Sequence, residues 1–360
     1  MKTFENISNY KVSQVNAFIK HRDSFHSANI FVLFGLALVF FVGVIGNIIV
    51  LYVFAWKKRQ SRSKFETLLV PLALIDLLTS FITPIIFTYG TLTNYRRWDF
   101  GQFGCKVLSS FFPVSITLSQ SILVFISYER YKVVISPFYR SFKKILIRFW
   151  VLLTILISLI LVSPYTDSLE IVIDTGYDIY TCMPNSNKHY QLYFYSVGNT
   201  FRDFLATVAM VYFGYKTNQY IQRNIKTITD RRHKFKRIIC AIKARKMLVV
   251  VVCCFSFCVF PLDLFQAITY TLYITKTIQN VKSYNLLLQA NTYLTVLQVA
   301  NSALNIIIYS QMHNDFRRAR CCRVHRKNRQ YIGIRLRSKT SESMINNEID
   351  FVKVINVLKT

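Results

Sequence analysis

The sequence predicts an all-α membrane protein, built as a bundle of seven transmembrane helices. Of the 360 residues, 52% are hydrophobic and 15% aromatic, although the chain also carries a net charge of +28. Long apolar runs explain this combination, because each is near or above the roughly 20 residues that a helix needs to cross a bilayer. A nucleic-acid-binding protein is also basic but has no need of such runs, so we expect no nucleic-acid partner.

Seven such runs follow one another along the chain, and together they place the bundle in residues 30–310. No run of signal-peptide length precedes the first, so we expect residues 1–29 to form an uncleaved tail. An odd number of spans puts the two ends of the chain on opposite sides of the membrane. The predicted spans are Ile30–Trp56, Phe65–Leu92, Phe103–Val134, Ile145–Pro164, Tyr190–Tyr215, Met247–Ile274 and Tyr284–Tyr309.

The basic residues between the spans predict which side is which. Thirty-three Lys and Arg residues fall on the side of the C-terminus and nine on the side of the N-terminus. Cytoplasmic segments carry the excess of positive charge, so the N-terminus is predicted to be extracellular. The basic segments then lie beside anionic membrane lipid, which accounts for the net charge.

Cysteine positions agree with this orientation. Of eight cysteines only Cys105 and Cys182 fall on the outer side, so if they are oxidised they can pair only with each other. Cys321 and Cys322 lie in a basic stretch shortly after the last span, a context that suits reversible palmitoylation. Asn6 heads the one glycosylation sequon of the outer side.

The histidines argue against an enzyme. All six lie outside the predicted spans, so an intramembrane zinc protease or Ser-His hydrolase has no imidazole to use. A transporter built from repeats should show two matching halves, and the sequence shows no such internal symmetry. A transporter or channel stays the alternative from a different functional class.

Polar residues inside the spans indicate a functional core. A carboxylate at mid-bilayer costs about 3 kcal/mol on insertion scales, so Asp76 is expected to face the interior of the bundle. Asn301 and Asn305 are four residues apart on one helical face, and with Ser119 they would give Asp76 polar partners. The alternative is that these side chains hydrogen-bond separately to their own backbones.

An ordered set of motifs resembles the rhodopsin-like class of G-protein-coupled receptors, from Gly43 to about Cys322. The spacing of twenty-five residues between Cys105 and Arg130 is also that of the family. In chain order the motifs are "GVIGN" and "LALID" in the first two spans, "WDFG" before Cys105, "ERY" at 129–131, "FSFCVFP" in span six, and "NSALNIIIY" followed by "NDFRRARCC".

The resemblance implies a plasma-membrane receptor that binds an extracellular ligand and activates a heterotrimeric G protein, with arrestin as a further partner. It implies a short amphipathic eighth helix at 311–322 and a cytoplasmic tail at 323–360. No organic cofactor is implied. The polar core of Asp76, Ser119, Asn301 and Asn305 would hold a sodium ion, since a carboxylate with neutral oxygen donors offers hard ligands.

The same resemblance makes Glu129, Arg130 and Tyr131 the cytoplasmic switch. Glu129 would hold Arg130 at rest and release it when the G protein docks, whereas the alternative is a structural ion pair at the membrane edge. In the active state the arginine would be received by Tyr309 and by Tyr212 (or Tyr215, because span five lacks the proline that fixes its register).

Several departures from the family pattern accompany these matches. Val259 replaces the span-six tryptophan, Ile306 the span-seven proline, and Gln120 an aliphatic residue of span three. Ala241 stands where many members carry an acid facing Arg130, so we expect elevated basal activity. The replacements at Val259, Ile306 and Gln120 have the opposite effect, because they alter the residues that transmit activation from the ligand pocket to the cytoplasm and could hold the bundle inactive. They leave open whether signalling is intact.

Exclusion narrows the ligand class. An opsin needs a span-seven lysine where this chain has Val299, and aminergic members use a span-three aspartate where it has Phe112. The alternating loop "LEIVIDTGYDIYTCMPN" predicts a hairpin with an acidic rim. In the family that the chain resembles, such a hairpin and a proline at the position of Pro84 are common among peptide receptors, so the resemblance favours a neuropeptide. A small-molecule or lipid receptor is the alternative, and the acidic loop has the simpler interpretation of a solvated surface.

Ionisable residues near the outer half of the membrane predict the ligand pocket. Charge there is unfavourable unless it is paired or faces water. We expect Arg202 and Asp263 to line a cavity with Phe112 and Gln266, and Asp263 to take a basic group of the ligand. A salt bridge between spans five and six is the alternative role of Arg202 and Asp263.

Overall fold

A computed structural model gives the fold of the chain. It describes residues 26–57, 64–135, 144–174, 179–225, 242, 246, 249–275 and 281–312. The chain divides into two units, Met1–Met312 and His313–Thr360, and every described residue belongs to the first. The predicted eighth helix therefore lies almost entirely outside the described residues, as do the palmitoylation sites Cys321 and Cys322 and the sequon at Asn6.

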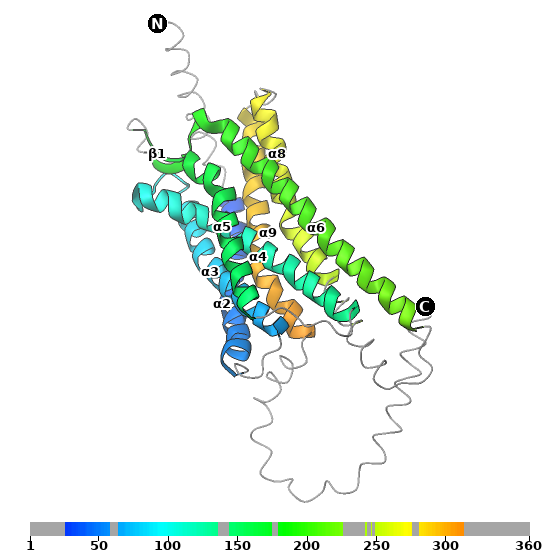
Figure 1. Cartoon of the computed structure of the whole chain (residues 1–360). Coiled ribbons are helices and arrows are strands. Elements are labelled where there is room, and N and C mark those ends of the chain that lie inside the picture. Colours follow the sequence, from blue (N-terminus) through cyan, green and yellow to red (C-terminus); the bar gives the residue numbers. More distant parts are fainter. Residues whose placement is uncertain are drawn as a thin grey trace, which may run out of the picture. The chain divides into compact units, whose positions relative to one another are not determined.

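The described residues form a bundle of long helices, which confirms the predicted fold class (Figure 1). Six of the spans are each dominated by one α-helix, and the sixth span is broken. The helices are α2 (His26–Leu51, continued by a π-helical turn at Tyr52–Lys57), α3 (Lys64–Leu92), α4 (Gly101–Ile135), α5 (Lys144–Ser168), α6 (His189–Ile225), α8 (Phe260–Ile274) and α9 (Val281–Met312).

Five helices of the described part are long and apolar enough to cross a membrane: Ile30–Trp56, Thr67–Leu92, Gly101–Ile135, Ile147–Ser168 and Val249–Leu272. The other two, α6 and α9, are 37 and 32 residues long. Their polar residues lower the mean hydropathy, and several of these residues build the sites described below.

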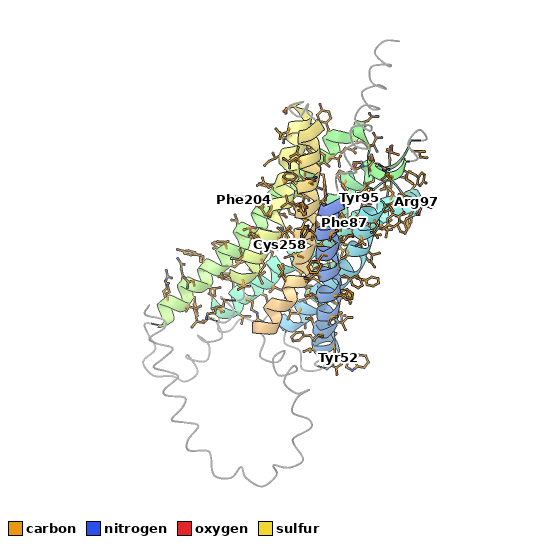
Figure 2. The ribbon with its side chains drawn as sticks, turned by 180° about the vertical axis from the view of Figure 1, so that it is seen from behind. Tyr52, Phe87, Tyr95, Arg97, Phe204 and Cys258 are labelled. Carbon is orange, nitrogen blue, oxygen red and sulfur yellow. A yellow bond between two sulfur atoms is a disulfide. The ribbon has the colours of Figure 1, made fainter. Side chains whose placement is uncertain are left out.

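Side chains on the outer faces of the helices are apolar. Phe34 and Phe41 on α2 are exposed, as are Phe201 and Phe204 on α6, and Figure 2 shows Phe204 on the outside of the ribbon. In water such faces would need a protein partner, but in a bilayer lipid tails cover them. Inside the bundle α4 contacts α3, α5 and α6, while α2 packs on α3 and α9.

Prolines mark two deviations from the predicted spans. Span six is helical at 249–258 and again in α8, with Val259 in a turn between them, because Pro261 has no N–H to continue the hydrogen-bond ladder. Helix α5 continues beyond Pro164 to Ser168. The prediction ended this span four residues early because hydropathy follows the lipid core and not the helix end.

The predicted hairpin follows α5. Strands β1 (Leu169–Asp174) and β2 (Ile179–Pro184) pair antiparallel with Ile171 opposite Cys182, and the turn at 175–178 lies outside the described residues. The structure joins Cys182 to Cys105 at the start of α4 by a disulfide with a Cα–Cα distance of 5.5 Å. The hairpin is thereby tied to one end of the bundle.

The loop between α3 and α4 completes this end of the bundle. Trp98 is buried against the disulfide and Leu169, and its Nε1 donates to the carbonyl oxygen of Gly101 at 3.1 Å. Gly101 has φ of 62°, a conformation that favours glycine. Hydrogen bonds from Arg97 and from the Tyr89 hydroxyl lower the pKa of the Asp99 carboxyl. The loop thus packs against the hairpin.

Candidate functional site

A cavity of about 170 Å³ lies between the helices near the hairpin end. Ser109 links it to the hairpin, because its Oγ lies 3.7 Å from the Cys182 sulfur. The lining side chains come from α3, α4, α5, α6, α8 and α9. They are Phe87, Ser109, Phe112, Pro113, Ile116, Tyr165, Tyr195, Asn199, Arg202, Leu262, Asp263, Gln266, Asn291, Thr295 and Gln298.

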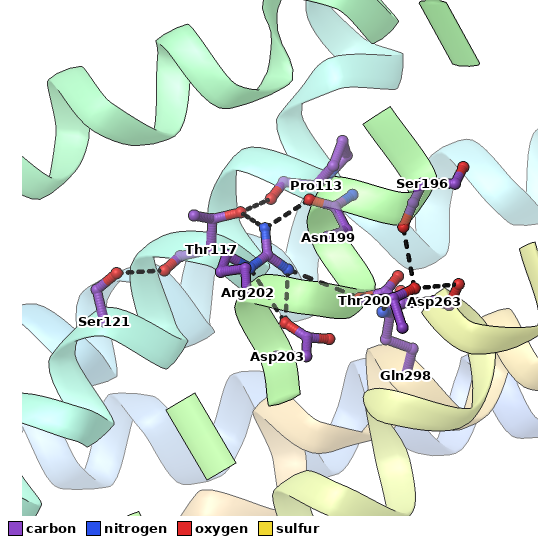
Figure 3. A network of polar contacts seen from close by, with 10 residues as sticks. All are labelled: Pro113, Thr117, Ser121, Ser196, Asn199, Thr200, Arg202, Asp203, Asp263 and Gln298. Carbon is purple, nitrogen blue, oxygen red and sulfur yellow. Dashed lines mark hydrogen bonds and ion pairs between the residues drawn. The ribbon is translucent and has the colours of Figure 1, made fainter. Parts of the chain in front are cut away.

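Arg202 of α6 holds the centre of the polar wall (Figure 3). Its Nη1 donates to Thr117 Oγ1 of α4 at 2.6 Å and to Asn199 Oδ1 at 2.8 Å. Its Nε and Nη2 both donate to Asp203 Oδ1, at 3.1 and 2.9 Å. The guanidinium therefore ties α4 to α6 through hydrogen bonds to three residues.

Asp263 of α8 faces Arg202 from the other side of the cavity. Its Oδ2 lies 3.6 Å from Arg202 Nη2, an ion-pair distance that is too long for a hydrogen bond. Its Oδ1 accepts a hydrogen bond from Gln298 Nε2 of α9 at 3.2 Å, and its backbone oxygen accepts one from Thr200 Oγ1 at 2.9 Å. Asp263 thus connects α8 to both α6 and α9.

These three charged side chains are withdrawn from the surface. The side chains of Arg202, Asp203 and Asp263 are 18%, 0% and 7% exposed. One guanidinium faces two carboxylates, so as ionised groups they leave an excess of one negative charge. Buried charge is stabilised only by close partners, so with both carboxylates ionised one further positive charge would balance the cluster.

Aromatic rings form the rest of the wall. Tyr165 stacks on Tyr195 with ring centroids 5.2 Å apart, and Phe87 meets Phe112 edge to face at 5.9 Å. Gln266 Nε2 donates to Asn291 Oδ1 at 3.2 Å and so links α8 to α9. Aromatic faces carry negative potential and suit a cationic guest.

The four residues predicted for the pocket do line this one cavity: Phe112, Arg202, Asp263 and Gln266. The alternative salt bridge is also present, although Arg202 lies closer to Asp203 than to Asp263. The prediction did not place the neutral partners of these charges, Thr117, Asn199, Thr200 and Gln298. Neutral Thr, Asn and Gln side chains are common inside membrane helices. They can be recognised as partners of a charge only when the relative positions of the neighbouring helices are known.

The predicted polar core lies further along the bundle. Ser119 Oγ of α4 donates to Asp76 Oδ1 of α3 at 2.9 Å, and both side chains are buried. Asn301 of α9 is buried as well, whereas the side chain of Asn305 lies outside the described residues. A carboxylate with a neighbouring hydroxyl oxygen fits a small hard cation.

A second polar contact, not predicted from the sequence, joins α2, α3 and α9. Ser80 and Ser302 share a hydrogen bond of 2.9 Å, and Asn47 Nδ2 donates to the backbone oxygens of Ser302 at 3.3 Å and Gly43 at 3.0 Å. Gly43 lies so close to Ser80 that a Cβ would overlap its side chain. The glycine is what allows the two helices to approach.

The predicted switch lies near the far end of α4. Glu129 is buried, and Tyr131 stacks on Phe213 of α6 with centroids 5.4 Å apart. Tyr212 and Tyr215 are 49% and 56% exposed, so neither side chain lies inside the bundle in this conformation. Of the remaining residues assigned to the switch, the side chain of Tyr309 and all of Ala241 lie outside the described residues.

The departures from the receptor pattern also have structural counterparts. Val259 is fully buried. Both polar atoms of the buried Gln120 amide are without a hydrogen-bond partner among the described residues. Helix α6 runs unbroken where a proline is usual, and the side chain of Ile306 is not described.

The acidic rim predicted for the hairpin is partly neutralised. Lys188 Nζ lies 2.8 Å from Asp167 Oδ2 and 3.9 Å from a carboxylate oxygen of Glu170. The side chains of Asp174 and Asp178 are not described. Within the described residues, the rim therefore has two carboxylates, Asp167 and Glu170, beside the ammonium of Lys188.

The chain is similar in sequence to seven-transmembrane receptors. The profile of the 7 transmembrane receptor (rhodopsin family) matches residues 46–309. The probable G-protein coupled receptor 34 of Pan troglodytes is 26% identical over 292 residues, covering 79% of this chain and 73% of the relative. The G-protein coupled receptor homolog K2 of Swinepox virus (strain Kasza) is 26% identical over 321 residues, covering 86% and 81%. The human substance-P receptor is 26% identical over 300 residues, covering 78% and 68%.

Proposed function

Because the chain belongs to the rhodopsin family of seven-transmembrane receptors, we propose that it is a plasma-membrane receptor for an extracellular peptide. The proposed ligand is a neuropeptide that carries a basic group. Family membership makes the chain a multi-pass membrane receptor that signals through G proteins, and it confirms the prediction that the chain is not an enzyme. The peptide ligand, the plasma-membrane location and the extracellular N-terminus are our proposals.

The observation that carries the proposal is Asp263 on the wall of the cavity. Its Oδ2 lies 3.6 Å from the Arg202 guanidinium and accepts no hydrogen bond from the described residues. A guanidinium or ammonium group of the ligand would complete the pairing of this carboxylate, with Arg202, Phe112 and Gln266 around it.

The volume of the cavity limits how much of the ligand can enter it. A volume of about 170 Å³ is below the roughly 300–1,000 Å³ of a typical small-molecule pocket. It fits one side chain or terminal group, while the remainder of a peptide would contact the hairpin of β1 and β2. A small-molecule or lipid ligand is the alternative, and the limited volume favours a compact head group for it.

Signal transfer is assigned to Glu129, Arg130 and Tyr131, with Tyr212 (or Tyr215) and Tyr309 as the residues that receive the arginine. The orientation is supported by the charge asymmetry of the connecting segments and by the disulfide at the hairpin end. A sodium ion at Asp76, Ser119, Asn301 and Asn305 would supply a counter-charge to the buried carboxylate. Arrestin, palmitoylation at Cys321 and Cys322 and glycosylation at Asn6 belong to the same proposal.

Nucleotide exchange on purified heterotrimeric G proteins tests the function. The receptor in nanodiscs is screened against basic and amidated peptides, with Arg130→Ala as the inactive control. We expect at least one basic peptide to raise the exchange rate of the wild-type receptor above that of the control. If only neutral small molecules or lipids do so, the alternative ligand class replaces the peptide.

A further inference from the structure

We propose that Asp203, which does not line the cavity, determines the charge of the ligand group that the cavity accepts. By holding Arg202, it leaves Asp263 as the one incompletely neutralised carboxylate of the cluster, so the cavity selects a group with a single positive charge. This inference rests on the proposed function of Asp263 and deepens it.

The distances show how Arg202 is shared. Two of its nitrogens donate to Asp203 Oδ1 at 2.9 and 3.1 Å, and a third donates to Thr117 and Asn199. Toward Asp263 the same guanidinium offers only Nη2 at 3.6 Å, without a hydrogen bond. The arginine is therefore directed by Asp203 toward α4 and α6, and away from the cavity wall on α8.

Burial strengthens the interaction of these carboxylates with a charged ligand. Asp203 is fully buried and Asp263 is 7% exposed, so solvent screens neither carboxylate well. Hydrogen-bonded pairing with Arg202 neutralises the first. The second keeps Gln298 as its hydrogen-bond donor, a neutral group that stabilises the carboxylate without cancelling its charge.

The cavity itself fits a compact cation. Phe87, Phe112, Tyr165 and Tyr195 contribute ring surface to its walls, and the volume of about 170 Å³ admits one planar head group. A carboxylate in the same place would face Asp263 at close range, and a neutral amide would leave the excess charge in place. The selected class is therefore a monocation with N–H donors, such as an amidinium or guanidinium.

Three probes of nearly equal shape test this inference: benzamidine, benzamide and benzoate. Their dissociation constants are measured by saturation-transfer NMR on the full-length receptor in nanodiscs. For the wild type we expect benzamidine to bind at least tenfold more tightly than benzamide, and benzoate to bind more weakly than both. Asp263→Asn should reduce the benzamidine preference to about parity.

The decisive variants separate direct from indirect effects. In Asp203→Asn, Arg202 is released to pair with Asp263, so the benzamidine preference should also fall to about parity. Adding Arg202→Gln should restore it, because Asp263 is again unpaired. Adding Arg202→Gln to Asp263→Asn should not restore it, because Asp203 lies outside the cavity. A purely structural role for Asp203 would weaken all three probes alike and would not be rescued.

The outcomes also distinguish this inference from the proposed function. A benzamidine preference that survives Asp203→Asn would overturn the role of Asp203 and leave the Asp263 anchor standing. A wild-type receptor that binds the three probes alike would overturn both. If Asp203→Asn does not fold, Asp203→Ser takes its place: a benzamidine preference near parity supports the inference, and an unchanged preference contradicts it.

Discussion

A single methyl group added at Gly43 is expected to destabilise the junction of α2, α3 and α9. A Cβ at this position would overlap both Cβ and Oγ of Ser80, and Ser80 is held in place by its 2.9 Å hydrogen bond to Ser302. Gly43→Ala must therefore push α2 away from α3 or break that hydrogen bond. Either response disturbs the helices that carry the polar core.

The magnitude follows from three contributions. Overpacking costs about 1–3 kcal/mol, and a lost interhelical hydrogen bond in a membrane protein costs about 0.6 kcal/mol. Replacing glycine by alanine within a helix returns up to about 1 kcal/mol. The net loss is about 2 kcal/mol, which corresponds to a fall in melting temperature of roughly 3 °C for a domain of about 280 residues.

Thermal unfolding of the purified receptor, followed by intrinsic tryptophan fluorescence, measures the effect. Gly198→Ala is the matched control, since a Cβ at Gly198 of α6 has nothing within 4 Å, and its melting temperature should not fall. Ser80→Gly should rescue Gly43→Ala by removing the atoms that clash. Equal melting temperatures for the Gly43 and Gly198 variants would refute the close approach of α2 and α3.

Three further predictions concern the disulfide, the polar core and the switch. Cys182→Ser should remove about 2–4 kcal/mol of stability and lower surface display. The exposed free thiol Cys253 should tolerate the same change. Recovery of Cys105 and Cys182 as free thiols from unreduced peptides would contradict the disulfide. Asp76→Asn should abolish the sodium dependence of agonist binding at constant ionic strength, and the absence of any dependence in the wild type would count against the sodium site. Ligand-free receptor should stimulate nucleotide exchange more than Arg130→Ala does, since a lost restraint of about 1.4 kcal/mol changes the state ratio tenfold; Ala241→Glu should lower that rate, and no difference from Arg130→Ala would rule out basal activity.

The sequence was sufficient to predict the parts of the site that are costly to place in a membrane. Arg202 and Asp263 had to face the interior because charge in lipid is unfavourable, and the structure brings both to one cavity. Cys105 and Cys182 were the outer cysteines, and the structure joins them. These predictions needed no knowledge of how the helices are rotated.

Other features depend on the register between helices, which hydropathy does not contain. Adjacent residues of a helix do not usually face each other, so a hydrogen-bonded Arg202–Asp203 pair was not expected, and it forms because the long arginine side chain folds back. Gly43 and Ser80 are ordinary residues of membrane helices, and only the packing of α2 on α3 shows that they meet.

The most direct test of the central claim is a matched pair of peptides acting on two receptors. An activating basic peptide is compared with the same peptide in which its arginine is replaced by neutral citrulline, and nucleotide exchange is measured for the wild type and for Asp263→Asn. We expect citrulline to lower potency at least tenfold on the wild type and to have little effect on Asp263→Asn. An equal loss of potency on both receptors would show that the basic group meets some other residue and would contradict the account.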